Sequence, residues 1–282
     1  MNTMNTDARF SFEFFPPRTD VGMEKLLTVH QELAALKPDF FSVTYGAGGS
    51  TRDGTRQTVT AIQQAGSDVA PHLSFGGSSS EDIAALLKSY QDLGINRLVA
   101  LRGDIPSGTG VAAQYYYANE LIEFVRATTG DHFHIEVACY PEIHPQSESF
   151  DSDILYFRKK VESGANSAIT QYFYNPDAYF YFVECCARAG IDIPIVPGIM
   201  PITNFNNLQR FSNNCGAEIP RWIRQRLQSY GDDSASIRQF GVEVVQQLCE
   251  KLLQGGAPGL HFYSMNHTEP VRQIWQQLGL KA

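Results

Sequence analysis

The sequence predicts a single-domain (β/α)8 barrel, and three observations lead to this prediction. Eight short apolar runs are rich in β-branched and aromatic residues, which is typical of strands. Segments of helical length with 3.6-residue periodicity separate these runs. The strand-and-helix units recur about every 30 residues, the size of one βαβ unit. A strict alternation over eight units indicates a parallel sheet that closes into a barrel.

The strands are expected at regular places along the chain. They are predicted over residues 9–15, 40–45, 69–75, 97–102, 134–140, 167–173, 193–199 and 260–265. Pro71 and Pro197 fall inside two of them, and each removes one backbone donor from the sheet. We expect bulges near the strand ends to accommodate both prolines.

Helices are predicted in the intervals between these strands. Clear examples are 22–37, 80–94 and 239–254, where apolar residues recur at helical spacing. Ser80 is the expected N-cap of the second of these helices, and Gly94 is expected to end it. The interval before the last strand is longer than the others, so extra helical material is predicted over residues 203–255. No linker-like tract interrupts the chain, and one domain is expected over residues 1–282.

Composition excludes several classes of protein. The chain has 282 residues, of which 43% are hydrophobic and 18% charged, an ordinary globular balance. Its net charge is −8 and no basic run is present, which argues against nucleic-acid binding. The five cysteines show no C-x-x-C spacing, and neither a secretory leader nor an apolar span is recognisable. We therefore expect a cytoplasmic protein with no membrane partner.

Glu13 lies in the most aromatic stretch of the chain, FSFEFF. Alternate residues of a barrel strand face the surrounding helices or the barrel interior. Phe10, Phe12 and Phe14 share one parity and are predicted to pack outward. Ser11 and Glu13 have the other parity, so Glu13 is predicted to point inward below the C-terminal mouth, where barrel enzymes carry catalytic groups. Burial beside aromatic groups would raise the pKa of Glu13, as suits a general acid. The alternative is a structural carboxylate paired with an arginine.

Polar or amphipathic residues finish most of the other predicted strands, which indicates a binding site at the mouth. They are Thr44 and Tyr45, His72, the triplet Arg102-Gly103-Asp104, Tyr140 with His144, Gln171, and Tyr263.

Other kinds of site remain open at this point. Glu13 with Asp104 could form the acid/base pair of a barrel glycosidase, although neither tryptophan falls at a strand end to stack on a sugar. A flavin-dependent proline dehydrogenase-like oxidase and a catalytically silent binding barrel are further alternatives. The GTGVAA sequence at residues 108–113 matches a dinucleotide fingerprint only loosely. No zinc-ligand spacing occurs, so no metal is expected.

Eight blocks of sequence resemble the bacterial methylenetetrahydrofolate reductase family, in register and in chain order. They are SFEFFPPR, SVTYGAGGSTRD, APHL, LVALRGD, YPEIHP, GANSAITQYFY, PGIMPITNF and HFY. Together they run from about residue 9 to residue 265, and each lies at a predicted strand end.

This resemblance implies a flavoprotein oxidoreductase of one-carbon metabolism. FAD would lie across the barrel mouth without a Rossmann domain. The enzyme would reduce 5,10-methylenetetrahydrofolate to 5-methyltetrahydrofolate with NADH or NADPH in a ping-pong reaction, for methionine synthesis. A small-molecule folate partner and a homo-oligomer are expected. The second domain through which eukaryotic relatives sense S-adenosylmethionine is expected to be missing.

The resemblance also assigns roles to individual residues. Glu13 would protonate N10 of the folate, and the charge of Asp104 would stabilise the cationic iminium that follows. Positions matching flavin contacts are Thr44, Tyr45, Ala47, His72, Arg102, Gly103, Asp104, Tyr117, Ala118, Tyr140, His144, Asp153 and Lys160, and Lys159 would face the pyrophosphate beside Lys160. Substrate positions are Gln171, Tyr179, Asn207, Phe211, Tyr263 and His267.

Three positions depart from the family pattern. His267 stands where an arginine is expected, and Asn207 stands where a longer amide is common. Tyr156 differs at a position next to the flavin. The first two substitutions would alter contacts to the folate tail and leave the chemistry untouched.

Overall fold

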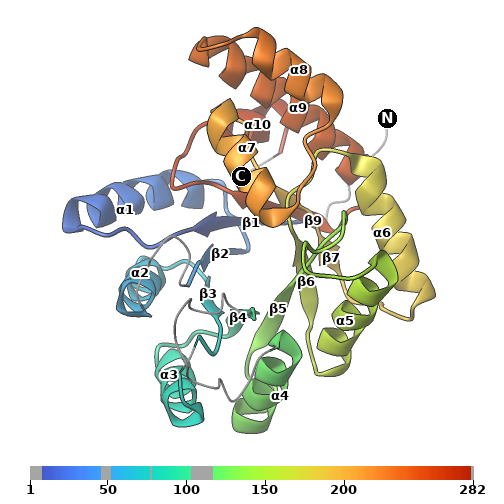
Figure 1. Cartoon of the computed structure of the whole chain (residues 1–282). Coiled ribbons are helices and arrows are strands. Elements are labelled where there is room, and N and C mark those ends of the chain that lie inside the picture. Colours follow the sequence, from blue (N-terminus) through green and yellow to red (C-terminus); the bar gives the residue numbers. More distant parts are fainter. Residues whose placement is uncertain (1–7, 46–51, 77, 103–116, 281–282) are drawn as a thin grey trace, which may run out of the picture.

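Parallel strands form a barrel inside a ring of helices in the computed structural model, which describes residues 8–45, 52–76, 78–102 and 117–280 (Figure 1). The strands are β1 Arg9–Phe14, β2 Phe40–Val43, β3 Val69–Leu73, β4 Arg97–Ala100, β5 His134–Cys139, β6 Ser167–Thr170, β7 Ile195–Val196, β8 Gly198–Ile199 and β9 Gly259–Tyr263. The helices are α1 Asp20–Ala34, α2 Arg52–Gln64, α3 Ser80–Asp92, α4 Ala118–Thr129, α5 Phe150–Glu162, α6 Pro176–Arg188, α7 Phe205–Cys215, α8 Arg221–Ser229, α9 Ser234–Gln254 and α10 Val271–Gln277. Within these residues, none of the helices combines the length and the apolar character needed to span a bilayer.

The strand order confirms the predicted barrel. The sheet runs β7-β6-β5-β4-β3-β2-β1-β9-β8, and all pairings between the described strands are parallel. The two ends of this order, β7 and β8, are consecutive in the chain and are separated only by Pro197. Ile195 pairs with β6, while Gly198 pairs with β9. Strands β7 and β8 therefore close the barrel between β6 and β9.

The segment 193–199 corrects the prediction of eight unbroken strands. It forms two strands of two residues each, because Pro197 has no N–H to contribute to a ladder. Its carbonyl still accepts a hydrogen bond from His261 N at 3.0 Å. Gly198 then passes so close to Thr170 O that an added Cβ would lie 2.2 Å from it. Only glycine fits at this crossing.

Pro71 needs no bulge, contrary to expectation. Residues Val69 to Pro71 of β3 pair with β2 in continuous register. Pairing with β4 begins at His72. The missing N–H of Pro71 therefore falls where β3 changes from one partner strand to the other.

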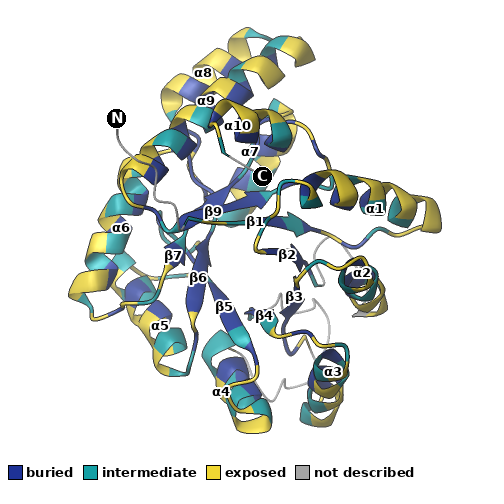
Figure 2. Ribbon diagram, turned by 180° about the vertical axis from the view of Figure 1, so that it is seen from behind, coloured by how far each residue is buried: buried dark blue, intermediate teal, exposed yellow. Residues whose placement is uncertain are grey.

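The aromatic residues of β1 pack outward as predicted, against neighbouring strands and the helices. Phe12 and Phe14 are completely buried. The ring of Phe12 lies 5.9 Å from that of Trp275 on α10, and Phe14 stacks on Phe41 of β2 at 5.4 Å. Strands and inner helix faces are buried while outer helix faces are exposed (Figure 2). This packing fixes the direction of the inward residues of β1.

Helices α7, α8 and α9 form the predicted extra material and gather beside the β1 and β9 side of the barrel (Figure 1). Several helix boundaries differ from the prediction; α1, for example, covers Asp20–Ala34 where residues 22–37 were expected. Helix α9 begins at Ser234, five residues before the expected start. The N-cap of α3 is Ser79, whose hydroxyl accepts from Asp82 N in a capping box, so Ser80 is already the first helical residue.

An ion cluster lies inside the barrel near the strand starts. We call Arg97, His134, Glu136 and Ser167 the lower ion cluster. Arg97 Nη1 contacts Oε1 of Glu136, and Ser167 Oγ donates to Oε2. His134 Nε2 lies 3.3 Å from Oε1. Burial alone would raise the pKa of Glu136, but hydrogen bonds from His134 and Ser167 and the charge of Arg97 outweigh it and lower the pKa.

Glu136→Gln should destabilise the fold by about 3 kcal/mol at neutral pH, because it leaves the mostly buried Arg97 without its counter-charge. The pKa of Glu136 is depressed in the folded state, so its stabilising contribution is complete above 4.5 and is lost as the pH falls below that value. Urea unfolding of both proteins at several pH values measures this difference.

Asp92→Asn is the matched control, because it breaks the exposed Lys88–Asp92 pair. It should change the free energy of unfolding by less than about 1 kcal/mol. Equal losses in the two variants would contradict a stabilising role for the lower ion cluster.

Candidate active site

Glu13 points into the barrel near the end of β1, as predicted, and its side chain is 19% exposed. Three side chains converge on its Oε2 atom. His72 Nε2 of β3 lies 3.3 Å away and His261 Nε2 of β9 lies 3.6 Å away. Ser42 Oγ of β2 donates to the same oxygen at 3.5 Å. One carboxylate oxygen is thus shared by groups from three other strands.

His261 and Ser42 were not singled out from the sequence. His261 is completely buried, and its Nδ1 shares a 2.7 Å hydrogen bond with Ser11 Oγ. Ser11 pairs with His261 and Glu13 pairs with Tyr263 across the β1–β9 ladder. In the GLHFY stretch, His261 has the same parity as Tyr263, so the alternation rule that located Glu13 could have found it.

The pKa of Glu13 is lowered to about 2, which corrects the prediction of a raised value. Burial raises the pKa, as expected from the aromatic sequence. The hydrogen bonds and charge interactions with His261 and His72 act in the opposite direction and prevail. The phenylalanines do not set the pKa, because their rings lie on the other side of the strand. The protonation state of Glu13 is therefore coupled to that of two histidines.

Unpartnered buried polar atoms at the mouth fit a polar ligand. Within the described residues, Thr44 Oγ1, His72 Nε2 and His261 Nε2 are buried and have no hydrogen-bond partner of good geometry. The backbone of Thr44 is held in place, since its N–H donates to Phe14 O at 2.9 Å and its carbonyl accepts from Thr55 at 2.9 Å. Both histidine nitrogens face Glu13 Oε2, at 3.3 and 3.6 Å, so Thr44 Oγ1 is the one of the three that suits a ligand, since buried polar atoms are rarely left unpaired.

The loop after β5 is braced by Asp153, one of the expected flavin contacts. Asp153 Oδ2 accepts from His144 N at 2.8 Å, and Oδ1 accepts from Ser147 Oγ at 3.1 Å. The His144 ring meets Tyr140 edge-on at 4.5 Å. Arg102 Nη2 reaches the same loop and donates to Gln146 at 2.5 Å. The structure thus brings Arg102, Tyr140, His144 and Asp153 together.

The two lysines of α5 point in different directions. Lys160 donates from Nζ to Ala138 O of β5, and burial lowers the pKa of its ammonium group. Lys160 therefore points toward β5, whereas it was expected to point outward to a pyrophosphate. Lys159 is exposed and lies over the Tyr156 ring, with Nζ 5.1 Å from the ring centroid.

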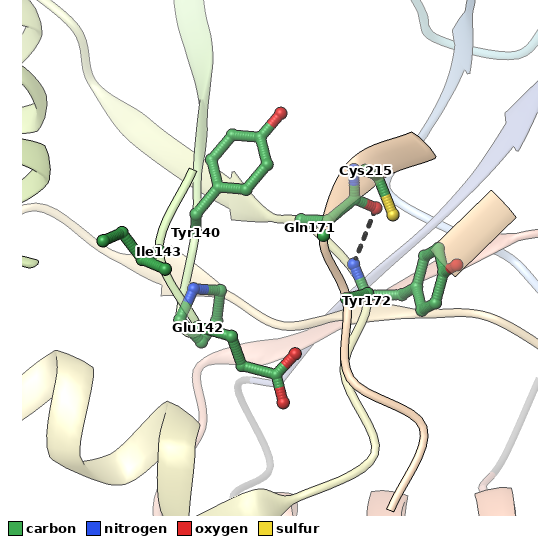
Figure 3. Close-up of a pocket in the computed structure, with 9 residues that line it drawn as sticks. Tyr140, Glu142, Ile143, Gln171, Tyr172 and Cys215 are labelled. Atoms are coloured by element: carbon green, nitrogen blue, oxygen red, sulfur yellow. Dashed lines mark hydrogen bonds between the residues drawn. The ribbon is translucent and has the colours of Figure 1, made fainter. Parts of the chain in front are cut away.

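Gln171 lines a small pocket at the ends of β5 and β6 (Figure 3). Its Oε1 accepts from Tyr172 N at 3.0 Å, and its side chain also hydrogen-bonds the hydroxyl of Tyr140, whose pKa burial raises to about 12. Glu142 and Cys215 also line this pocket, and neither was singled out from the sequence. Burial raises the pKa of Glu142 to about 7, helped by the charge of Glu218 and opposed by a hydrogen bond from Glu218 N.

The remaining expected substrate residues are spread over several elements. Tyr179 is buried, and its hydroxyl donates to Ile195 O at 2.8 Å, so it belongs to the core and does not border the cleft as expected. Tyr263 donates across the barrel to Thr170 O at 2.7 Å. Phe211 is half-buried and Asn207 exposed, both on α7, and His267 is exposed beyond β9.

The other expected flavin contacts lie near the ends of elements or outside the described residues. Tyr45 is half-buried at the end of β2, Tyr117 is the N-cap of α4, and Ala118 is its first residue. Ala47, Gly103 and Asp104 lie outside the described residues. Within those residues, no group of three or more potential metal ligands occurs, which gives the structure no support for a metal centre.

Comparison with known proteins gives one consistent family. The methylenetetrahydrofolate reductase family model matches residues 1–279. The chain is 36% identical over 272 residues to the 5,10-methylenetetrahydrofolate reductase of Escherichia coli, covering 96% of this chain and 90% of that one. It is also 36% identical to methylenetetrahydrofolate reductase (NADH) 1 of Arabidopsis thaliana over 96% of this chain and 48% of that protein.

A solved structure has the same fold. It is a Clostridium thermocellum protein described as binding two copies of 5-methyl-5,6,7,8-tetrahydrofolic acid. Its TM-score is 0.71 with 16% sequence identity, and the match covers 97% of this chain and 94% of that one.

His72→Gln should raise the pKa of Glu13, because one positive neighbour is lost while the burial of the carboxyl group remains. The measurement is a pH titration of the Glu13 carboxyl by ¹³C NMR, assigned with Glu13→Gln. His132→Gln is the control, since His132 is exposed and its Nε2 contacts Ile95 O. An unchanged or lower pKa in His72→Gln would show that this histidine does not hold the charge of Glu13.

Proposed function

The chain belongs to the methylenetetrahydrofolate reductase family, and we propose that it reduces 5,10-methylenetetrahydrofolate to 5-methyltetrahydrofolate with a nicotinamide and a bound FAD. The observation that carries this proposal is the carboxylate of Glu13 between two histidines at the barrel mouth. It is a proton-handling group where this architecture places its chemistry.

The flavin would be held by residues at the ends of β2 to β5. Thr44 Oγ1 is buried without a hydrogen-bond partner among the described residues, and Arg102 and His144 lie on the loops after β4 and β5. When bound there, FAD would supply the hydride chemistry, taking a hydride from the nicotinamide and passing it to the folate. The names of plant relatives favour NADH as the donor.

Glu13 would deliver the proton that opens the folate ring. Protonation of N10 breaks the bond to the bridging carbon and leaves a cationic iminium that accepts hydride. Since His261 and His72 lower the pKa of Glu13, the proton would be shared within this cluster. His261, which Ser11 orients, would return the proton to Glu13 after each turnover. Asp104 is proposed to stabilise the cation.

Gln171 and Phe211 would hold whichever substrate occupies the cleft. The amide of Gln171 lines the pocket beside Tyr140, where its NH₂ would donate to the carbonyl of either a pterin or a nicotinamide. Phe211 offers an aromatic face from α7 for stacking. One cleft used in turn by two flat substrates accounts for a ping-pong reaction. The barrel would act as a single cytoplasmic domain, and the product would feed methionine synthesis.

Bound flavin is the first test of this function. The purified protein should be yellow, or should gain flavin absorbance when FAD is added to the apoprotein. It should then oxidise NADH anaerobically and become reoxidised by methylenetetrahydrofolate. Protein that binds no flavin would exclude this function and would return the glycosidase alternative to consideration.

Glu13→Gln should leave flavin reduction by NADH within about threefold of the unmodified rate and should slow folate reduction by at least about 100-fold, because only the second half-reaction needs the proton. Anaerobic stopped-flow measurement separates the two half-reactions. Glu24→Gln, which removes an exposed carboxylate of α1, should change neither rate. If Glu13→Gln slows both half-reactions equally, the proton-donor role is wrong.

A further inference from the structure

The end of β1 is held by side chains as well as by the sheet. Glu13 is the last residue of β1 that pairs with β9, where it lies opposite Tyr263. Ser264, which follows β9, donates from Oγ to Glu13 O at 2.6 Å. Thr44, which follows β2, donates from its N–H to Phe14 O at 2.9 Å. The backbone that carries the Glu13 side chain is therefore bonded from both sides.

Asn266 extends these contacts by one more residue. Its Oδ1 accepts from Phe15 N at 3.0 Å, and its Nδ2 donates to Phe15 O at 2.8 Å. A side-chain amide offers the same donor and acceptor as a peptide group, so Asn266 takes the place of a further strand residue beside Phe15. Pro16 and Pro17 come next and have no N–H to donate. We call the two hydrogen bonds between Asn266 and Phe15 the Asn266 clamp.

The turn that carries the Asn266 clamp has an unusual backbone. Met265 and Asn266 both lie in the left-handed region, with φ of 55° and 56°. Asparagine tolerates this conformation, whereas methionine rarely adopts it. The turn is held because Asn266 N donates to Ser264 Oγ at 3.2 Å and His267 N donates to Ser264 O at 3.0 Å. Backbone strain of this kind persists where surrounding contacts enforce it, and it gathers at functional sites.

The Asn266 clamp lies two residues from Glu13, whose carboxylate has strict positional needs. Its Oε2 lies 3.3 Å from His72 Nε2 and 3.6 Å from His261 Nε2, and these histidines come from strands on either side of β1. A rotation of the backbone at the end of β1 would move the carboxylate away from one histidine or the other. Hydrogen bonds and charge interactions weaken steeply over such movements. The geometry of the acid therefore depends on a fixed strand end.

We propose that Asn266 is a positioning residue for proton transfer by Glu13: it fixes the backbone at the end of β1, so that the carboxylate stays between its two histidines. This inference rests on the proposed proton-donor role of Glu13. Asn266 makes its contribution through the backbone of Phe15. Its loss should therefore impair the half-reaction that needs the proton and spare the other.

Asn266→Gly removes the clamp and keeps a residue that suits the left-handed backbone, so the variant should fold. In anaerobic stopped flow, reoxidation of its reduced flavin by saturating methylenetetrahydrofolate should slow about tenfold or more, while flavin reduction by NADH stays within about twofold of the unmodified rate. The pKa of Glu13, followed by ¹³C NMR, should rise toward its ordinary value of 4.5, because the carboxylate moves away from the histidines.

Met265→Gly is the matched control. Met265 has the same left-handed φ one position earlier, so glycine there changes the same turn while the Asn266 clamp stays. Both half-reactions and the pKa of Glu13 should be unchanged in this variant. Equal slowing of folate reduction by the two glycine variants would assign the effect to the flexibility of the turn and would overturn the inference.

Three other outcomes would also overturn it. If Glu13→Gln stops folate reduction but Asn266→Gly does not slow it, the proposed function stands and the positioning role is wrong. If Asn266→Gly raises only the KM for the folate, with the rate at saturation and the pKa of Glu13 unchanged, Asn266 serves substrate binding beside His267. If Glu13→Gln leaves folate reduction unchanged, the proton-donor role on which the inference rests is itself wrong.

Discussion

A carboxylate oxygen shared by two histidines inside the barrel is the interaction on which the candidate site depends. An ionised carboxyl group is unfavourable in a largely buried place unless partners replace its lost water. For Glu13 those partners are His72, His261 and Ser42, each from a different strand. The sheet order puts β9 directly on one side of β1, with Ser11 paired to His261, and β3 beyond β2 on the other side. The broken strand at Pro197 adds to this arrangement, because Pro197 O accepts from the backbone N–H of His261 at 3.0 Å.

Two polar layers inside the barrel have different roles. The upper layer contains Glu13 and its histidines and opens toward the mouth. The lower ion cluster closes the other end of the barrel, where Glu136 is held by side chains of three adjacent strands. Between them lies an apolar layer that includes Phe40, Val99 and Ile169. In (β/α)8 barrels, catalytic residues generally lie at the strand ends, and residues that stabilise the fold lie at the strand starts.

Much of this site could be predicted because it follows from local rules. Alternation along β1 placed Glu13 inside and Phe12 outside, and the structure confirms both. The alternation rule applies only to strands, so it could not place Tyr179, which lies on α6 and donates from its hydroxyl to Ile195 O. Aromatic neighbours in sequence suggested an apolar setting for Glu13. They face away from it, and the residues that do surround it come from distant parts of the chain.

The sequence by itself determined the barrel, the strand parity, the polar strand ends and the family, since each depends on residues close together in the chain or on motifs in fixed order. The tertiary structure alone decided the direction of the pKa shift of Glu13, the change of partner strand at Pro197 and the inward turn of Lys160. These depend on distances of a few ångströms between segments far apart in sequence. Electrostatic and stacking energies change sharply over such distances, whereas residue order carries no measure of them.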